Sequence, residues 1–144
     1  MDMENKVRQI RELVEAKREK FARVSDEVWA VPELYFHETK SAAILIKALK
    51  EEGFEVQEGV DGIPTAFIGT WGSGKPVIGI LGEFDALPSL SQEAGCWEHK
   101  EIVKGGPGHG CGHNALGAGA MAAAVAAKDY MEKNGLSGTI RYYG

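Results

Sequence analysis

The side chains most able to do chemistry lie in two short stretches, and the first contains a cysteine and a histidine separated by one glycine. In residues 105–114, Cys111 and His113 offer a thiolate and an imidazole nitrogen, which are ligands that borderline-soft divalent ions prefer. The glycines around them let an extended backbone approach an ion, with both donors on one side. A helix that begins after this stretch directs its positive end at Cys111 and favours its thiolate. The pattern therefore predicts half of a metal site.

The second stretch is Gly-Glu-Phe-Asp-Ala-Leu-Pro at residues 82–88, directly after an apolar run. Glu83 and Asp85 are two residues apart, so their carboxylates point to the same side of an extended backbone. They follow a predicted strand, where α/β folds place ligands, and carboxylates beside a Cys/His pair bind the metal or hold its ligands in place. Taken alone, each stretch has a plainer explanation. Residues 82–88 could be a turn with solvated acids, and residues 105–114 could hold a buried thiol beside a solvated histidine.

Three helical regions are expected to position these stretches. Residues 4–30 have helical periodicity, with Ser25 capping a second segment that Pro32 ends. Residues 37–53 form the next helix, which a C-terminal glycine caps. Residues 115–133 are rich in Ala and Gly, and because glycine weakens a helix, this composition predicts close packing against a sheet.

Strands are expected between these helices and after the last one. The continuous apolar run at residues 76–81 predicts a strand buried on both faces. Residues 84–113 lack periodicity, and so long an irregular segment inside a domain indicates a functional loop. The order of helices and strands predicts a layered α/β fold without repeats or a second domain. The other predicted strands are residues 54–57, 66–69 and 139–143.

Together with their flanks, the two stretches resemble metallopeptidase family twenty, the aminoacylase and N-acyl-amino-acid amidohydrolase family. The central motifs are Gly-Glu-Phe-Asp-Ala-Leu-Pro at 82–88 and Gly-His-Gly-Cys-Gly-His-Asn-Ala-Leu-Gly at 108–117. Ala-Val-Pro-Glu-Leu at 30–34 is similar to the end of an early helix in the family. Ile-Pro-Thr-Ala at 63–66 and Gly-Lys-Pro-Val-Ile at 74–78 resemble the aminobenzoyl-glutamate utilisation protein B branch. The resemblance covers most of the chain.

The resemblance implies a fold and a reaction. The fold is a helix–sheet–helix catalytic domain of the zinc-peptidase type, which a smaller dimerisation domain interrupts. Residues 1–144 then correspond to the N-terminal part of the catalytic domain, with the dimerisation domain absent. The reaction is hydrolysis of an amide bond in an N-acyl amino acid or dipeptide-like substrate of the aminobenzoyl-glutamate type. Two divalent cations, zinc or manganese, lower the pKa of a water for this reaction, and a homo-oligomer is the expected assembly.

The family's functional residues match individual positions of this chain. Cys111 and His113 match the metal-binding cysteine and histidine, and Asp85 matches the acid that orients a metal ligand. Glu83 stands where peptidase branches have a ligand histidine and amidohydrolase branches have an acid. His109 matches a histidine that is not usually a ligand, so we expect it to contact substrate or form a hydrogen bond.

The resemblance also implies what these residues lack. The family's general-base glutamate and its neighbouring metal ligand follow a strand that resembles residues 140–143, and further histidine ligands come later. None of them lies within the 144 residues. Because the chain offers half of a dinuclear site and no base to deprotonate water, we expect it to hydrolyse no amide at a measurable rate by itself.

The composition and the terminal sequence limit the classes of partner and the cellular compartment that we expect. Asp and Glu number 21 against 16 Lys and Arg, a net charge of −5, which argues against nucleic acid as a partner. The longest uncharged apolar run, residues 117–127, is too short to cross a bilayer, so no membrane partner is expected. The N-terminus lacks the basic and apolar segments of a signal peptide, and there are only two cysteines, which predicts a cytoplasmic protein with reduced thiols.

Two other hypotheses stay open from the residues. A small non-catalytic metal-binding module would use the Cys-Gly-His loop, with Cys96 and His99 as a second pair. A phosphate-binding protein would use the Gly-rich stretch before a helix, although that stretch has neither Gly-x-Gly-x-x-Gly nor a Gly-Lys-Ser/Thr ending. Metal content separates the first two hypotheses from the third. Whether the natural polypeptide continues past Gly144 separates the hydrolase from the module.

Overall fold

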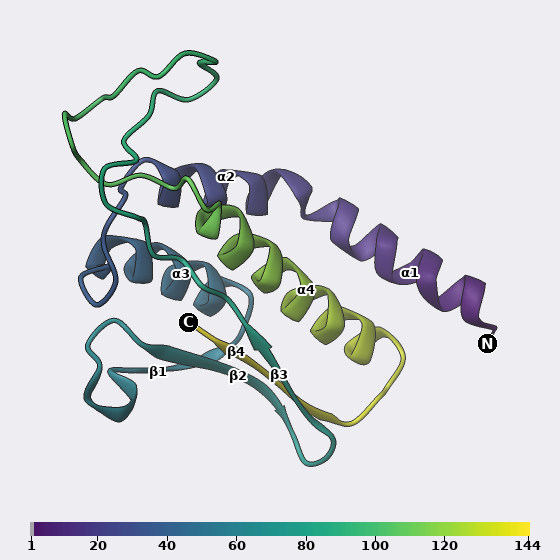
Figure 1. The fold of residues 1–144 in the computed structure, drawn as a ribbon. Helices are drawn as coiled ribbons and strands as arrows, with labels where there is room; N and C mark the ends of the chain where they lie inside the picture. The colour runs from purple at the N-terminus through teal and green to yellow at the C-terminus, as the bar shows by residue number, and fades with distance from the viewer. Residues whose placement is uncertain (1) are drawn as a thin grey trace.

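The described part of the chain, residues 2–144 of a computed structural model, forms one mixed sheet with helices on one of its faces (Figure 1). The elements are α1 (Met3–Ala16), α2 (Arg18–Trp29), α3 (Thr39–Glu51), β1 (Glu55–Glu58), the short 3-10 helix η1 (Val60–Gly62), β2 (Phe67–Ser73), β3 (Val77–Leu81), α4 (His113–Lys133) and β4 (Gly138–Tyr143). The strand order is β1-β2-β4-β3, with β3 parallel to β4 and the other pairs antiparallel. The α/β class is confirmed.

The central strand β4 anchors the core. Ile140 and Tyr142 are buried beneath α4, and the Tyr142 hydroxyl donates a hydrogen bond of 3.1 Å to the Gly117 carbonyl of that helix. Burial raises the pKa of Tyr142 well above its usual value. α3 lies against β1 and β2, and α2 packs on α3 and α4 as an outer helical layer (Figure 1). The other fully buried large apolar side chains are Phe67, Leu45, Leu49, Met121, Val28 and Val125.

The small residues of α4 let that helix approach the backbone that follows β3. A Cβ atom on Gly117 would lie 2.9 Å from the carbonyl oxygen of Glu83, so a larger residue would push the two elements apart. This confirms the predicted close packing at Gly117. Gly119 is exposed and has no neighbour within 4 Å of such an atom, so packing does not require it. In residues 2–144, neither α4 nor any other helix has the length and apolar character that crossing a membrane requires.

The first predicted helix is two helices in the structure, and the break is not where the sequence predicted it. The backbone leaves helical geometry at Lys17, with φ −114° and ψ 10°, and Ser25 lies inside α2 instead of capping a new segment. The Ser25 hydroxyl instead accepts a hydrogen bond of 3.0 Å from the Asn114 side chain. The ends at Pro32 and Gly53 are confirmed, because α2 stops at Trp29 and Gly53 adopts φ +82° after α3.

The prediction that residues 76–81 are buried on both faces is wrong. Val77 is 52% exposed, Ile78 49% and Leu81 75%. The reason is position, since β3 is the edge strand of the sheet and the described helices cover one face only. The sequence of β3 is therefore as apolar as that of a strand buried on both faces, although many of its side chains are exposed in the described part of the chain.

Candidate metal centre

Two acids and one histidine meet at the carboxyl end of β3. His113 is the first residue of α4, and its Nδ1 lies 2.7 Å from Asp85 Oδ1. Its Nε2 lies 3.1 Å from Glu83 Oε2. The imidazole is largely buried, with 15% of the side chain exposed, whereas the Glu83 side chain is 64% exposed. The sequence predicted that the carboxylates of Glu83 and Asp85 point to the same side, and in the structure both contact the His113 ring.

This arrangement suits a cation. If Nδ1 donates to Asp85, the Asp85 carboxylate fixes the orientation of the ring, and Nε2 points at the second carboxylate. A lone pair facing a carboxylate is repulsive, so Nε2 needs either a proton or a metal ion between itself and Glu83. An oriented imidazole with a neighbouring carboxylate offers ligand types that divalent metal ions accept.

The backbone before His113 positions this ring by a turn. The Gly112 N–H donates to the His109 carbonyl at 3.0 Å, and Gly112 adopts φ 78° as the N-cap of α4. The prediction of an extended backbone at Cys-Gly-His is therefore wrong, because Gly112 adopts a left-handed conformation at the start of α4. Cys111 is a free, exposed thiol at this turn.

The described donors fit one part of a metal site. Within residues 2–144, no group of three or more His, Cys, Asp or Glu side chains is arranged to hold a metal ion. Glu83 and Asp85 flank His113, while Cys111 stands two residues away at the surface. The donor types match a divalent metal, and the described cluster does not complete its coordination.

The Pro-Glu-Leu segment, which carries part of the family resemblance, is hydrogen-bonded to the loop of this cluster. The Glu33 carboxylate accepts hydrogen bonds from the backbone N–H groups of Lys40 (3.0 Å) and Ser41 (2.9 Å) and so caps α3. The Glu33 carbonyl accepts from the Ala86 N–H at 2.8 Å, directly after Asp85. The segment therefore links the start of α3 to the loop that carries Asp85.

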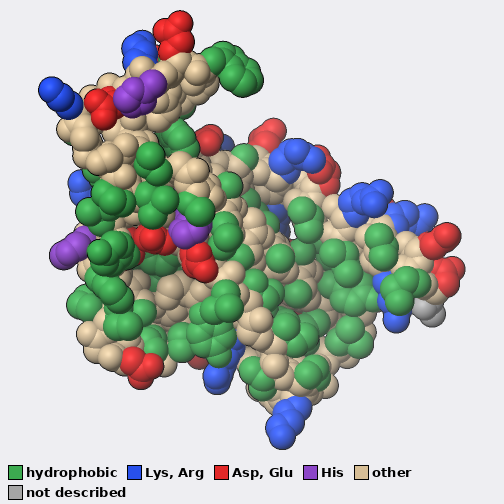
Figure 2. All heavy atoms as spheres, in the orientation of Figure 1, with side chains coloured by type: hydrophobic (Ala, Val, Ile, Leu, Met, Phe, Trp, Pro, Cys, Tyr) green, Lys and Arg blue, Asp and Glu red, His purple; other side chains and the backbone are tan. Residues whose placement is uncertain are grey.

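A third acid, Glu38, lies near this cluster, and the sequence did not single it out. Glu38 is 7% exposed, and its Oε2 has no hydrogen-bond partner in the described residues. It lines a cavity of about 380 Å³ together with Glu83 and Asp85. Figure 2 shows acidic and histidine side chains together near the start of α4, surrounded by hydrophobic ones. An acid before a helix is usually explained by the helix dipole, so only the fold shows that Glu38 is buried beside the site.

His109 lies apart from this acidic cluster. It is 4% exposed, and its ring centroid lies 6.1 Å from that of Trp29. Burial lowers the pKa of His109 below its usual value. The Val28 backbone opposes this shift, although neither ring nitrogen has a partner in hydrogen-bond geometry among the described residues. The expected hydrogen bond of His109 is thus absent among the described residues, and its expected contact with substrate stays a prediction.

Comparison with known proteins gives relatives over nearly the whole chain. The B subunit of the p-aminobenzoyl-glutamate hydrolase of Escherichia coli (strain K12) is 47% identical over 142 residues, which are 99% of this chain and 30% of that protein. Thermostable carboxypeptidase 1 of Saccharolobus solfataricus is 33% identical over 114 residues, 78% of this chain and 26% of that protein. No family model matches the chain. The chain thus spans less than a third of the length of these curated relatives.

Solved structures share the fold and cover the same part of the chain. A protein of methicillin-resistant Staphylococcus aureus described as an aminohydrolase superposes with a TM-score of 0.74 at 28% identity, over 94% of this chain and 34% of that one. A dinuclear metal-binding peptidase of the M20 family from Bacillus subtilis has the same fold, with a TM-score of 0.65 at 23% identity over 90% of this chain and 35% of that one. By its motifs, its relatives and its fold, the chain belongs to metallopeptidase family twenty.

Proposed function

We propose that this chain contributes to the metal-dependent hydrolysis of an amide bond in an N-acyl amino acid or dipeptide-like substrate. The observation that carries the proposal is the contact of both His113 ring nitrogens with Asp85 and Glu83 at the end of β3. A structural ion pair needs one carboxylate for one imidazole. Two carboxylates on one ring instead leave negative charge that a bound cation neutralises.

Each residue has a proposed role. Asp85 accepts the Nδ1 proton of His113 and holds the ring so that Nε2 is directed at the metal. Cys111 is the second ligand, because its exposed thiol stands directly before the N-cap of α4 and two residues from His113. Glu83 holds negative charge beside Nε2 as a ligand or as a partner of one. Two divalent ions, zinc or manganese, would supply the Lewis acidity that lowers the pKa of the attacking water.

The substrate class is inferred from the relatives. One is named for hydrolysis of p-aminobenzoyl-glutamate and another as a carboxypeptidase, and both reactions cleave an amide bond next to an amino acid. We therefore propose a small substrate of the aminobenzoyl-glutamate type. Because a complete metal cluster is not found in residues 2–144, we expect no measurable hydrolysis by the 144-residue chain alone.

The proposal extends to assembly and compartment. The relative from Escherichia coli is named as one subunit of its enzyme, and the exposed apolar side chains of β3 offer surface for association. We propose a homo-oligomer, which sedimentation of the purified protein tests directly. A net charge of −5 supports neither nucleic acid nor an acidic membrane surface as a partner. The cytoplasm is the proposed compartment, and cell fractionation tests it.

The test measures metal binding and hydrolysis with matched variants. Zn²⁺ and Mn²⁺ binding is measured by equilibrium dialysis for the 144-residue chain, for Cys111→Ser and His113→Gln, and for the controls Cys96→Ser and His99→Gln. We expect binding to weaken in the first two variants only. Hydrolysis of 4-aminobenzoyl-glutamate is then assayed, with and without chelator, in the longest polypeptide that the gene encodes.

Chelator-sensitive hydrolysis that His113→Gln abolishes would support the proposal. Metal binding at Cys111 and His113 without hydrolysis by any product of the gene would contradict it and favour the non-catalytic metal-binding module. Equal metal binding by all five proteins would contradict both functions, because the metal would then bind elsewhere.

A further inference from the structure

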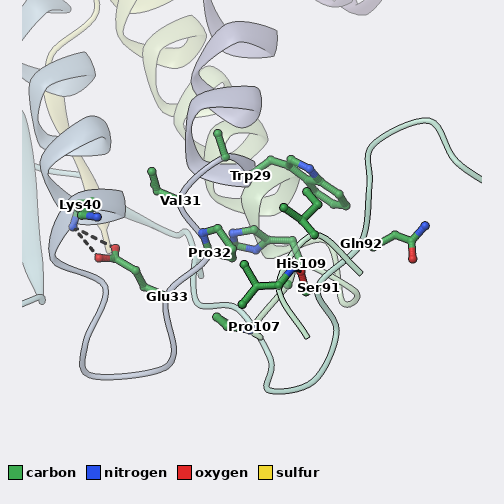
Figure 3. Close-up of a pocket in the computed structure, with 13 residues that line it drawn as sticks. Trp29, Val31, Pro32, Glu33, Lys40, Ser91, Gln92, Pro107 and His109 are labelled. Atoms are coloured by element: carbon green, nitrogen blue, oxygen red, sulfur yellow. Dashed lines mark hydrogen bonds between the residues drawn. The ribbon is translucent and has the colours of Figure 1, made fainter. Parts of the chain in front are cut away.

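A second cavity, of about 350 Å³, lies between the C-terminal end of α2 and the irregular segment 91–109 (Figure 3). Its walls are mainly apolar and include Trp29, Pro32 and Pro107. None of the four residues proposed for the metal centre lines it. Its volume falls within the range of roughly 300–1,000 Å³ found for small-molecule sites. The cavity is therefore large enough for a compact ligand and separate from the acidic cluster.

Glu33, Lys40, Ser91 and Gln92 also line this cavity, but His109 is its buried polar side chain without a partner in the described residues. The side chain is 96% buried, because only 4% of its surface is exposed, and neither ring nitrogen has a hydrogen-bond partner in the described residues. Figure 3 shows the ring among the apolar side chains that line the cavity. A neutral imidazole carries one donor and one acceptor. Since buried polar groups are nearly always paired, an imidazole left unpaired beside a cavity indicates a ligand with complementary groups.

Hydrogen bonds within the irregular segment fix one wall of the cavity. The Ser91 N–H donates to the Gly106 carbonyl at 3.0 Å, and Leu87 and Gly108 exchange two hydrogen bonds of 3.0 Å. The Ser91 hydroxyl accepts from the Val103 N–H at 3.0 Å. These contacts tie two parts of the irregular segment to each other, so a ligand would not have to order this wall of the cavity on binding.

We propose that this cavity binds a compact, flat aromatic molecule that carries one amide or a similar group with both a hydrogen-bond donor and an acceptor. The ring of the ligand packs against the flat faces of Trp29, Pro32 and Pro107, and the polar group pairs with the imidazole of His109. The site uses none of the four metal-centre residues, so ligand binding there can be measured without hydrolysis.

The experiment titrates benzamide into the isotope-labelled 144-residue chain and follows backbone amide signals by NMR. Cyclohexanecarboxamide keeps the amide without an aromatic ring, and toluene keeps the ring without the amide. His109→Phe removes both ring nitrogens at similar size, with His99→Phe as its exposed control. Ile102→Trp obstructs the mouth of the cavity, where Ile102 is 69% exposed, and Leu136→Trp, at a residue that does not line it, is its control.

We expect saturable benzamide binding with shifts confined to residues around the cavity, and weaker binding of both reference compounds. Binding should weaken about tenfold or more in His109→Phe and Ile102→Trp and stay unchanged in the two controls. Unsaturable shifts spread over the surface would overturn the proposal, as would unchanged affinity in Ile102→Trp. If His109→Phe does not fold, the Ile102→Trp and Leu136→Trp pair and the location of the shifts decide the question.

Discussion

Two polar clusters of this protein differ in how their charges are balanced. In the first, which we call the lysine cluster, Lys17 pairs with Glu52 and lies 3.0 Å from Asp129. Lys20 lies 2.7 Å from Glu52, and Lys128 lies 2.7 Å from Asp129. Each acid thus has ammonium partners within the cluster. In the second cluster two carboxylates, Glu83 and Asp85, share the single imidazole of His113.

The difference corresponds to the roles that we propose, a structural one for the lysine cluster and metal binding for the His113 cluster. The lysine cluster joins the α1–α2 break to the end of α3 and to α4, so its charges are satisfied by the fold itself. Burial works against ionisation of Glu52, but hydrogen bonds from Lys17 and Lys20 outweigh it, and the pKa of Glu52 lies below its usual value. The His113 cluster has an excess of acceptors that no described residue balances. This excess of acceptors at the end of a strand is why we propose that the cluster binds a cation.

The largest expected effect breaks the His113 cluster. Asp85→Asn removes the carboxylate that orients His113, and we expect Zn²⁺ affinity to fall by about 10–100-fold, the usual cost of losing such a partner. Equilibrium dialysis measures the change. Glu52→Gln alters an acid of the lysine cluster and should leave metal affinity unchanged. A fall in metal affinity in Glu52→Gln as large as in Asp85→Asn would remove the distinction between the clusters.

The next effect concerns the packing that places Glu83 beside α4. Gly117→Ala introduces a Cβ atom 2.9 Å from the Glu83 carbonyl oxygen, and we expect a loss of about 1–2 kcal/mol in the free energy of unfolding. Gly119→Ala meets no atom within 4 Å and should stabilise the helix by up to about 1 kcal/mol. Urea unfolding of both variants gives the two values. Equal changes in the free energy of unfolding for the two variants would mean that α4 does not pack closely against the Glu83 backbone.

A smaller effect is expected from the lysine cluster. Glu52→Gln leaves Lys17 and Lys20 with weaker partners, and because the Glu52 side chain is only 9% exposed, we expect a loss of about 1 kcal/mol in the free energy of unfolding. The control is Glu58→Gln, which breaks an exposed pair with Lys50 and should cost less than about 0.5 kcal/mol. Urea unfolding at neutral pH checks both, and a larger loss in the control would contradict a structural role for the lysine cluster.

The smallest effect is the acid dependence of the lysine cluster. The pKa values of Glu52 and Asp129 are lowered in the fold from ordinary values of 4.5 and 3.8. Because the unfolded chain then binds more protons, their stabilisation is present above the ordinary values and is lost as pH falls through the lowered ones. We expect the midpoint temperature of thermal unfolding to decrease once the pH is lowered below about 4.5, and to decrease less in Glu52→Gln. An identical pH profile in the variant would contradict this origin.

Local signals in the sequence predicted much of the scaffold. Pro32 and Gly53 end their helices as expected, because a proline and a left-handed glycine act on the backbone where they stand. The contact of Glu83 and Asp85 with one ring agrees with their spacing after a strand. These features depend on a single backbone segment and were predictable, whereas the Ser25 cap and the extended backbone between Cys111 and His113, which are also local, were predicted wrongly.

Features set by distant contacts were not predictable. The helix break at Lys17 coincides with ion pairs to Glu52 and Asp129, residues far along the chain. The exposure of Ile78 depends on the edge position of β3, which an apolar run does not reveal. The cavity at His109 needs α2 and the irregular segment together, and the motif that contains His109 predicts a contact for this residue without revealing the cavity.

The central claim is that the His113 cluster binds a divalent cation through an oriented imidazole. The most direct measurement is the ¹⁵N resonance of every histidine ring during a Zn²⁺ titration. We predict that His113 Nε2 shifts on metal binding while Nδ1 stays protonated toward Asp85, and that His37, His99 and His109 do not respond. A His113 ring that does not change while the exposed His37 and His99 do would contradict the claim.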